Sequence, residues 1–392
     1  MQTTPAPFRR DRLTWLTYIQ LGFYGALING LGPALAGLRT DLGLSHAEAG
    51  LHSSLFAVGM LSAGLAGDRI VRRLGRRRTL WLSTIGLTAG VLVFVLGRAL
   101  DVTLAGVLLA GTVGSLVILL VPAILSDHHG PRRATAFSEA NSVSSAMGAV
   151  APLLVGASIA LGGGWRPGLV AATILAVPAL ALLSRRVEIP EPRAVTTESH
   201  GRLGVAYRVH WVMLVLVISA EFCIVFWTAD FLRTRFGLEP SLAAGAVTIF
   251  LVGMVTGRTA GARLALHHDP GVVVRVALLV AAAGFAIFWL SPWAALSVAG
   301  VLVAGLGMAG LYPMTLGLAV ASALEATDLA ASRAALASGS AVLAGPLVLA
   351  ALADAAGIAA AFAIVPVLLA LSWLLQAVVP RLASSRAVEP VP

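Results

Sequence analysis

Long apolar segments recur along almost the whole chain, and they constrain the fold more than any other feature. A helix that crosses a bilayer needs about 20 predominantly apolar residues. Twelve such segments can be drawn, at 13–37, 46–67, 79–97, 102–125, 136–161, 167–184, 209–232, 241–264, 272–291, 294–318, 331–353 and 358–379. Open sheets leave backbone groups unsatisfied in lipid, and the segments are too long for barrel strands. The sequence therefore predicts an all-α membrane protein with twelve transmembrane helices.

The composition agrees with a chain that lies in a membrane. Charged residues make up only 11% of the sequence and hydrophobic residues 58%, whereas soluble domains carry about a quarter charged residues. The net charge of +9 would favour nucleic acid as a partner for a soluble protein, but here the basic residues lie between apolar segments. We therefore expect contacts with membrane lipid and none with nucleic acid, and we expect a monomer.

The arginines predict the orientation of the segments. All 27 residues of the Lys/Arg class are arginines, and 21 of them fall on the side of the membrane that holds both termini, against five on the other side. Cytoplasmic loops carry such an excess of basic residues. We predict a multi-pass protein of the inner (plasma) membrane of a bacterial cell, with its N- and C-termini in the cytoplasm.

A linker and an internal repeat divide the chain. Residues 185–207 contain prolines and charges without an apolar period, and they separate six segments in 1–184 from six in 208–380, followed by a tail at 381–392. Residues 38–69 align without gaps to 232–263, with 13 of 32 positions identical at an offset of 194. Two similar halves in the same orientation predict two pseudo-symmetric six-helix bundles related by an axis along the membrane normal.

Two motifs resemble those of the major facilitator superfamily. The segment GLAGDRIVRRLGRRR (64–78) is similar to the signature between the second and third helices of that family, and GAVAPLLVG (148–156) is similar to the glycine–proline motif of helix 5 in its antiporter branches. The resemblance covers nearly the full length and implies alternating access by rocking of the two halves. The basic residue that drug/proton antiporters carry in helix 4 is absent, and Val107 stands in its place.

Charged residues near the cytoplasmic ends of the segments form a candidate gate. By resemblance to the family, Asp68 at the end of segment 46–67 contacts segment 331–353, where Arg333 lies, and the repeat offset carries Glu139 onto Arg333. We predict two ion pairs between the halves, Asp68 with Arg333 and Glu139 with Arg258 or Arg263, that break when the cytoplasmic side opens. Alternatively, the arginine run only sets topology and binds anionic lipid, and Glu139 only stabilises the start of its helix.

A carboxylate in the middle of segment 209–232 is the candidate for proton coupling. Glu221 lies in LVLVISAEFCIVFW, and an ionised carboxylate at that depth costs about 3 kcal/mol on insertion scales. It must face a cavity, find a partner or remain protonated, so we predict that it exchanges protons during transport. The alternative is a structural hydrogen bond to a neighbouring helix. Asp230, near the outer end of the same segment, is predicted to pair with Arg233, and a role in substrate entry is the alternative.

The resemblance also implies a central cavity lined by the first, fourth, seventh and tenth segments. The candidate substrate contacts there are Tyr24, Asn29, Trp227 and Tyr312. We find no phosphate-binding glycine loop, so neither ATP drive nor another cofactor is expected. The adjacent histidines of DHHGPRR (127–133) and HHDP (267–270) are poorly placed to share one metal ion, so no metal site is expected.

These features predict a secondary active transporter and not an enzyme. The partial helix-5 motif favours proton-coupled efflux of a small organic molecule by antiport. Proton-coupled uptake of a small organic acid or nutrient by symport is the alternative, and a membrane sensor that does not transport is a third possibility.

Overall fold

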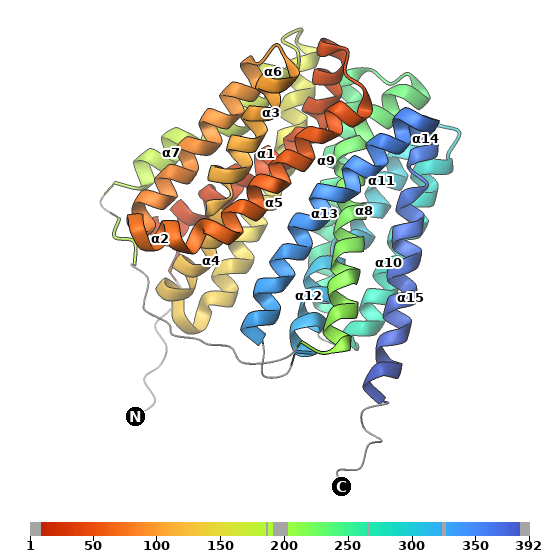
Figure 1. The fold of residues 1–392 in the computed structure, drawn as a ribbon. Helices are drawn as coiled ribbons and strands as arrows, with labels where there is room; N and C mark the ends of the chain where they lie inside the picture. The colour runs from red at the N-terminus through yellow and green to blue at the C-terminus, as the bar shows by residue number, and fades with distance from the viewer. Residues whose placement is uncertain (1–8, 186, 191–202, 265–266, 324–326, 385–392) are drawn as a thin grey trace.

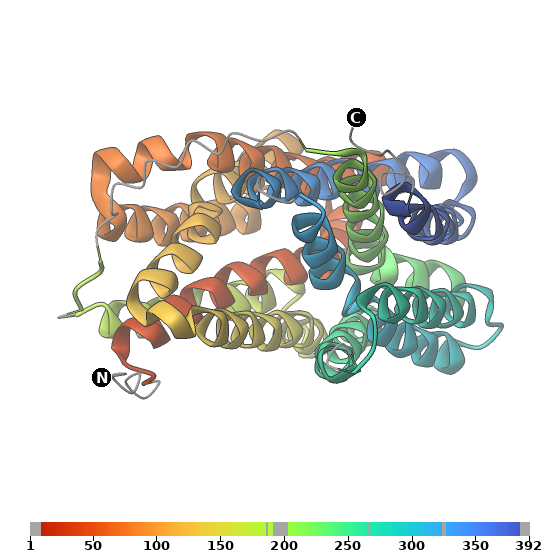
Figure 2. The same cartoon turned by 90° about the horizontal axis from the view of Figure 1, so that it is seen from below.

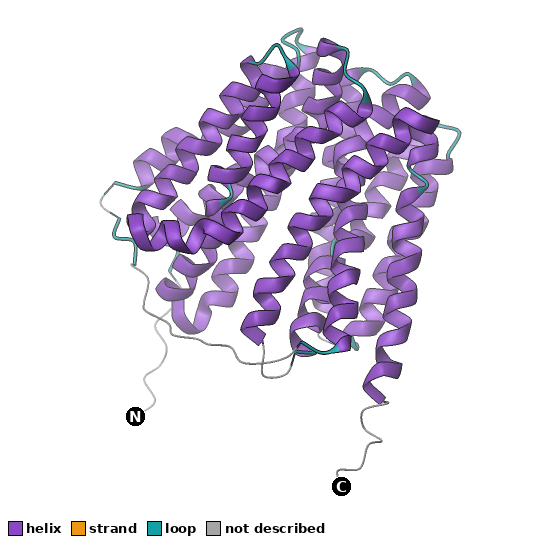
Figure 3. Ribbon diagram, viewed as in Figure 1, coloured by secondary structure: helices purple, strands orange, loops and turns teal. Residues whose placement is uncertain are grey.

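The computed structural model describes residues 9–185, 187–190, 203–264, 267–323 and 327–384. In these ranges the chain is helical and contains no strand (Figure 3). The helices are α1 (Arg12–Leu42), α2 (His46–Leu96), α3 (Leu100–Leu109), α4 (Leu116–His129), α5 (Arg133–Ala160), α6 (Trp165–Ile174), α7 (Ala176–Leu183), α8 (Val205–Phe236), α9 (Pro240–Leu264), α10 (Pro270–Leu290), α11 (Ala294–Met308), α12 (Leu311–Ala321), α13 (Thr327–Ala356), α14 (Ile358–Ala361) and α15 (Ile364–Ser384). The all-helical fold class is confirmed.

Eleven helical stretches of the described chain are long and apolar enough to cross a membrane, and one of them is the 51-residue α2. Gly75 interrupts α2 with φ 75°, a backbone region that glycine adopts without strain. Gly59 packs against Thr112, while Gly90 packs against Ala110. A straight helix would separate these glycines by about 46 Å, so the chain must reverse at Gly75. The predicted count of twelve spans follows, with segments 46–67 and 79–97 on either side of the reversal.

The internal repeat is visible in helix packing. Gly90 approaches Ala110 so closely that a Cβ atom would lie 2.6 Å from its backbone nitrogen, and Gly284 approaches Ala304 in the same way at 2.2 Å. The two glycines and the two alanines are each 194 residues apart. Small residues that let helix backbones approach are the usual means of packing helices in lipid. The same packing therefore builds both bundles, α1–α7 and α8–α15.

Two spanning stretches are broken at equivalent places. A π-helical turn at Ala110–Gly114 separates α3 from α4, and the turn at Ala309 and Gly310 separates α11 from α12. Such irregular backbone is tolerated at membrane depth where it is buried in protein or lines a cavity. The second break places Tyr312 at the beginning of α12.

The bundles meet along two symmetric helix pairs, α2 with α13 and α5 with α9. Figure 2 shows the two bundles side by side, and Figure 1 shows their ribbons diverging toward the end where α1 begins and α15 ends. We call this the basic end, because it also carries the arginine run at the reversal of α2. The opposite end, where α1 and α8 finish, is called the closed end, because side chains of both bundles join there.

Candidate functional site

Glu221 lies near the middle of α8 and is half-buried. The guanidinium of Arg258, on α9, is close enough to act electrostatically on its carboxylate, and Tyr312 of α12 also interacts with it electrostatically. Two opposite charges inside a membrane span stabilise each other, and removing one leaves the other uncompensated. Arg258, on a neighbouring helix of the same bundle, therefore acts on Glu221 through its charge, although the ion pairs of the described residues include none between the two.

Arg258 also reaches the other bundle. Its Nη1 donates a 2.6 Å hydrogen bond to Oγ of Ser145 on α5. Tyr312 in turn interacts with the side chain of Ser338 on α13. We call Ser145, Glu221, Arg258, Tyr312 and Ser338 the central cluster. It contains one carboxyl group, one guanidinium and three hydroxyls, and its members come from both bundles.

Two members of this cluster, Arg258 and Tyr312, were not expected beside Glu221 from the sequence. Arg258 was expected at the gate with Glu139, yet in this conformation its neighbours are Glu221 and Ser145. Glu139 instead accepts hydrogen bonds from Arg10, at 2.8 and 2.7 Å, and from Tyr18, at 3.1 Å, all within its own bundle. Tyr312 was expected to contact substrate and does join the cluster.

The other candidate cavity residues lie in helix packing in this conformation. Tyr24 is 7% exposed and contacts Met60 and Ser115, while Asn29 donates to the carbonyl of Gly25. Trp227 is 2% exposed, and its indole nitrogen donates to the carbonyl of Pro346 on α13. Roles for these three side chains in binding substrate stay predictions.

The remaining predicted gate residues lie at the basic end without their expected partners. The Asp68 side chain is 88% exposed, and its ion pair with Arg72 measures 4.0 Å. Arg333 is exposed and its carbonyl accepts from Trp211, and Arg263 is exposed as well. Among the ion pairs of the described residues none joins the two bundles at this end. The gate pairs stay a prediction for a conformation in which the basic end is closed.

Two arginines of the run also form hydrogen bonds to the chain that follows α7. Arg76 is only 7% exposed, and its Nη1 contacts Asp127 at 2.6 Å and the carbonyl of Pro190 at 2.7 Å. Arg77 donates to the carbonyls of Ser184 and Val187. These two side chains thus fix the first residues of the expected linker 185–207, of which 186 and 191–202 lie outside the described residues.

The start of α1 is fixed by a second small network at the basic end. Asp11 caps the helix by accepting from the backbone N–H and the hydroxyl of Thr14, and it contacts His128 at 2.8 Å. Partial burial alone would raise the pKa of Asp11, but the hydrogen bonds from Thr14 and the charge of His128 outweigh it and hold the pKa below its usual value. His129 contacts Thr14 at 3.0 Å. In the described part of the chain no group of three or more His, Cys, Asp or Glu side chains has the placement of a metal site.

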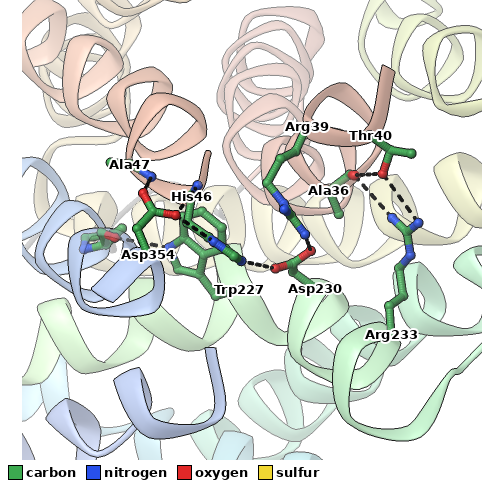
Figure 4. Close-up of polar contacts among 10 residues, drawn as sticks. Ala36, Arg39, Thr40, His46, Ala47, Trp227, Asp230, Arg233 and Asp354 are labelled. Atoms are coloured by element: carbon green, nitrogen blue, oxygen red, sulfur yellow. Dashed lines mark hydrogen bonds and ion pairs between the residues drawn. The ribbon is translucent and has the colours of Figure 1, made fainter. Parts of the chain in front are cut away.

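A four-residue network joins the bundles at the closed end (Figure 4). Nη2 of Arg39 lies 2.7 Å from Asp230, and Nε2 of His46 lies 3.0 Å from the other oxygen of the same carboxylate. Nδ1 of His46 lies 2.9 Å from Asp354, which also accepts from the backbone N–H groups of His46 and Ala47. We call Arg39, His46, Asp230 and Asp354 the closed-end network. It ties α1 and α2 to α8 and α13.

The predicted pair of Asp230 with Arg233 is wrong. Asp230 is 2% exposed and turns toward the other bundle, where Arg39 and His46 lie. Arg233 lies one turn further along α8 and donates instead to the carbonyl of Ala36, at 3.1 Å, and to Thr40, at 3.4 Å. Spacing along one helix did not indicate that both side chains have partners on α1.

A sequence signal for part of this network was present in the repeat. The motif Leu-Arg-Thr occurs at 38–40 and again at 232–234, and both of its arginines cross to the other bundle. His46 and Asp354 have no counterpart in the repeat, since Pro240 and Ala160 stand at the equivalent positions. Only the three-dimensional arrangement brings these two side chains together.

These features define a membrane transporter of small molecules. The chain belongs to the Major Facilitator Superfamily, whose family profile matches residues 17–323. The chain is 24% identical to the cyanate transport protein CynX of Escherichia coli (strain K12) over 308 residues, which cover 75% of this chain and 77% of that protein.

Solved structures share the fold. A D-xylose-proton symporter superposes with a TM-score of 0.73 at 17% identity, over 94% of this chain and 96% of that one. A bacterial homolog of the human lysosomal transporter Spinster, in an inward-facing and occupied conformation, gives 0.70 at 15% identity, over 96% of this chain and 98% of that one. The predicted membership in this superfamily is confirmed.

Proposed function

We propose that this protein takes up a small anion together with a proton across the bacterial cytoplasmic membrane. The observation that carries the proposal is the placement of Arg258, whose charge acts on Glu221 and whose guanidinium donates to Ser145 of the other bundle. The names of two similar proteins point the same way: one is a cyanate transport protein and the other a proton symporter.

The charge balance of the central cluster explains the coupling. With Glu221 ionised, the charge of Arg258 is compensated and an anion gains little by entering. A proton on Glu221 leaves the guanidinium uncompensated, so that an anion can take the place of the carboxylate charge. The hydroxyls of Ser145, Tyr312 and Ser338 supply additional hydrogen-bond donors. A proton and a monovalent anion would thus bind together, and the loaded site would carry the same charge as the empty one.

The orientation of the chain is part of the proposal. The excess of arginine at the basic end favours placing that end in the cytoplasm. The described conformation would then be closed toward the outside and open toward the cytoplasm, the state from which an importer releases its substrate. The closed-end network would break, and the predicted pairs of Asp68 with Arg333 and of Glu139 with Arg263 would form, when the protein turns to the outside.

Efflux by antiport is the second candidate, and it rests on the glycine–proline segment of α5. Gly148 packs against Asn29, and Gly156 against the backbone of Ser241, so this segment lies where bundle movements would be transmitted. In antiport the substrate and the proton compete for one group. A cation would compete for the Glu221 carboxylate, whereas an anion would require its protonation. The charge of the substrate therefore distinguishes the two candidates.

Proteoliposomes that enclose a pH-sensitive dye provide the test. Cyanate, D-xylose and the cation ethidium are added outside in turn, with protein-free vesicles as the control. Acidification of the lumen on addition of cyanate is the expected result. Alkalinisation of the lumen on addition of ethidium would indicate antiport. Transport of D-xylose but of neither ion would contradict the role proposed for the charge of the substrate. No flux of any probe would favour a sensor.

A further inference from the structure

An open groove of about 490 Å³ runs between α8 and α13 at the basic end. Figure 2 shows these two helices along one edge of the bundle, where lipid would contact them. The groove is lined by Leu203, Tyr207, Arg208, Trp211, Val212, Arg333 and Leu336. It lies apart from the central cluster and from the closed-end network.

Two aromatic side chains of α8 form the floor of the groove. The hydroxyl of Tyr207 donates to the carbonyl of Ala330 at 2.8 Å, and the indole nitrogen of Trp211 donates to the carbonyl of Arg333 at 2.8 Å. They lie one turn apart, so both hold the first turns of α13 against α8. Because the O–H of Tyr207 and the N–H of Trp211 are used by these bonds, neither side chain has a donor left for a ligand, and the two rings offer it apolar surface.

The two guanidinium groups supply the polar part of the groove. Arg208 and Arg333 are both exposed, and neither forms an ion pair with an acidic side chain in the described part of the chain. The apolar Val212 and Leu336 lie about one helical turn further from the basic end than the two arginines. From the basic end inward, the lining therefore changes from cationic to apolar, in the order of a phospholipid headgroup and its acyl chain.

We propose that this groove binds an anionic phospholipid of the surrounding bilayer. The phosphate lies between Arg208 and Arg333, and an acyl chain passes Trp211 toward Val212 and Leu336. Charge complementarity selects the lipid, because basic residues at the membrane surface attract anionic headgroups and basic pockets between helices bind them. Trp211 suits this depth, since tryptophan favours the boundary between headgroups and acyl chains.

Quenching of Trp211 fluorescence by brominated lipids tests the proposal. The purified full chain is placed in bilayers that contain brominated phosphatidylglycerol or brominated phosphatidylcholine, and the signal of Trp211 is obtained by subtracting that of Trp211→Phe. We expect phosphatidylglycerol to be preferred by about fivefold for each arginine. The double variant R208Q/R333Q should lose most of this preference.

A charge-matched control separates the groove from the general charge of the basic end. The double variant R69Q/R73Q removes two exposed arginines of the other bundle and should keep the preference. Equal quenching by both lipids in the native protein would overturn the proposal, and so would an equal loss in the two double variants. Because the readout is contact with lipid, it is independent of whether the protein transports an anion.

Discussion

Arg39 and Arg233 occupy equivalent positions in the two halves, 194 residues apart, and each crosses to the helix that carries the other. Arg39 of α1 pairs with Asp230 of α8, and Arg233 of α8 donates to the carbonyl of Ala36 on α1. Ala36 and Asp230 are themselves equivalent in the repeat. The closed end is thus held by one contact made twice, once with a carboxylate and once with a backbone carbonyl.

The charged half of this contact predicts an energetic coupling between Arg39 and Asp230. Asp230→Asn leaves Arg39 without a counter-charge and should lower stability by about 2 kcal/mol, less than for a fully buried pair because Arg39 is partly exposed. A double-mutant cycle with Arg39→Gln, followed by thermal unfolding in detergent, should show coupling. Arg235→Gln is the matched control, since Arg235 bonds to Ser291 of its own bundle, and additive effects of Arg39→Gln and Asp230→Asn would contradict the pairing.

His46 predicts that closure responds to pH. Both ring nitrogens face carboxylates, and only the imidazolium can donate to Asp230 and Asp354 at once. The network therefore binds the proton more strongly when closed, so acidification through the range in which His46 titrates should favour closure. Ser54 is buried beside Leu343 of the other bundle. In a Cys223→Ala background, the cysteine introduced by Ser54→Cys should therefore be alkylated more slowly as the pH drops. His46→Gln should leave only the pH dependence that ionisation of the thiol itself imposes, and a pH profile identical to that of the His46 protein would argue against His46.

The glycine contacts predict opposite effects of the same substitution at two sites. Gly284→Ala would place a methyl group 2.2 Å from the backbone nitrogen of Ala304, and overpacking of this kind costs about 1–3 kcal/mol. Gly245→Ala, in α9, meets nothing within 4 Å and should stabilise the protein by about 0.5–1 kcal/mol. Thermal unfolding of the two purified variants measures both effects, and equal Tm values would contradict the packing described for α10 and α11.

The latch predicted at the basic end can be tested in transport. Asp68→Asn and Arg333→Gln should each slow the cycle, and the double variant should be no slower than either one if the two side chains pair when that end closes. Initial rates in proteoliposomes complete the cycle. Asp68→Asn together with Arg73→Gln is the control, because both residues are exposed at the same end. Fully additive losses for Asp68 and Arg333 would remove the latch.

Helices could be predicted from the sequence because lipid imposes a length and a composition on them. The expected segments 136–161 and 272–291 differ from α5 and α10 by at most three residues at either end. The breaks at Ala110–Gly114 and at Ala309 and Gly310 were not expected, because an apolar run does not reveal a local change of helical hydrogen bonding.

The candidate site was only partly predictable. Glu221 was singled out because an acid at that depth is costly. Arg258, whose charge acts on it, was assigned to the gate, since equivalence in a repeat does not give the distance between two side chains. Arg39, His46 and Asp354 lie near helix ends, where charged residues are common and a single one carries no signal. Their contacts depend on how the bundles are tilted in this conformation.

The central claim is that Glu221 carries the coupled proton while Arg258 binds the anion. It is tested most directly by comparing two assays of Glu221→Gln in proteoliposomes, with the anion that the native protein transports. We predict that exchange of labelled for unlabelled anion across the membrane persists, because Arg258 keeps its charge, while accumulation driven by a pH gradient is lost. Accumulation at the native level by Glu221→Gln would contradict the account.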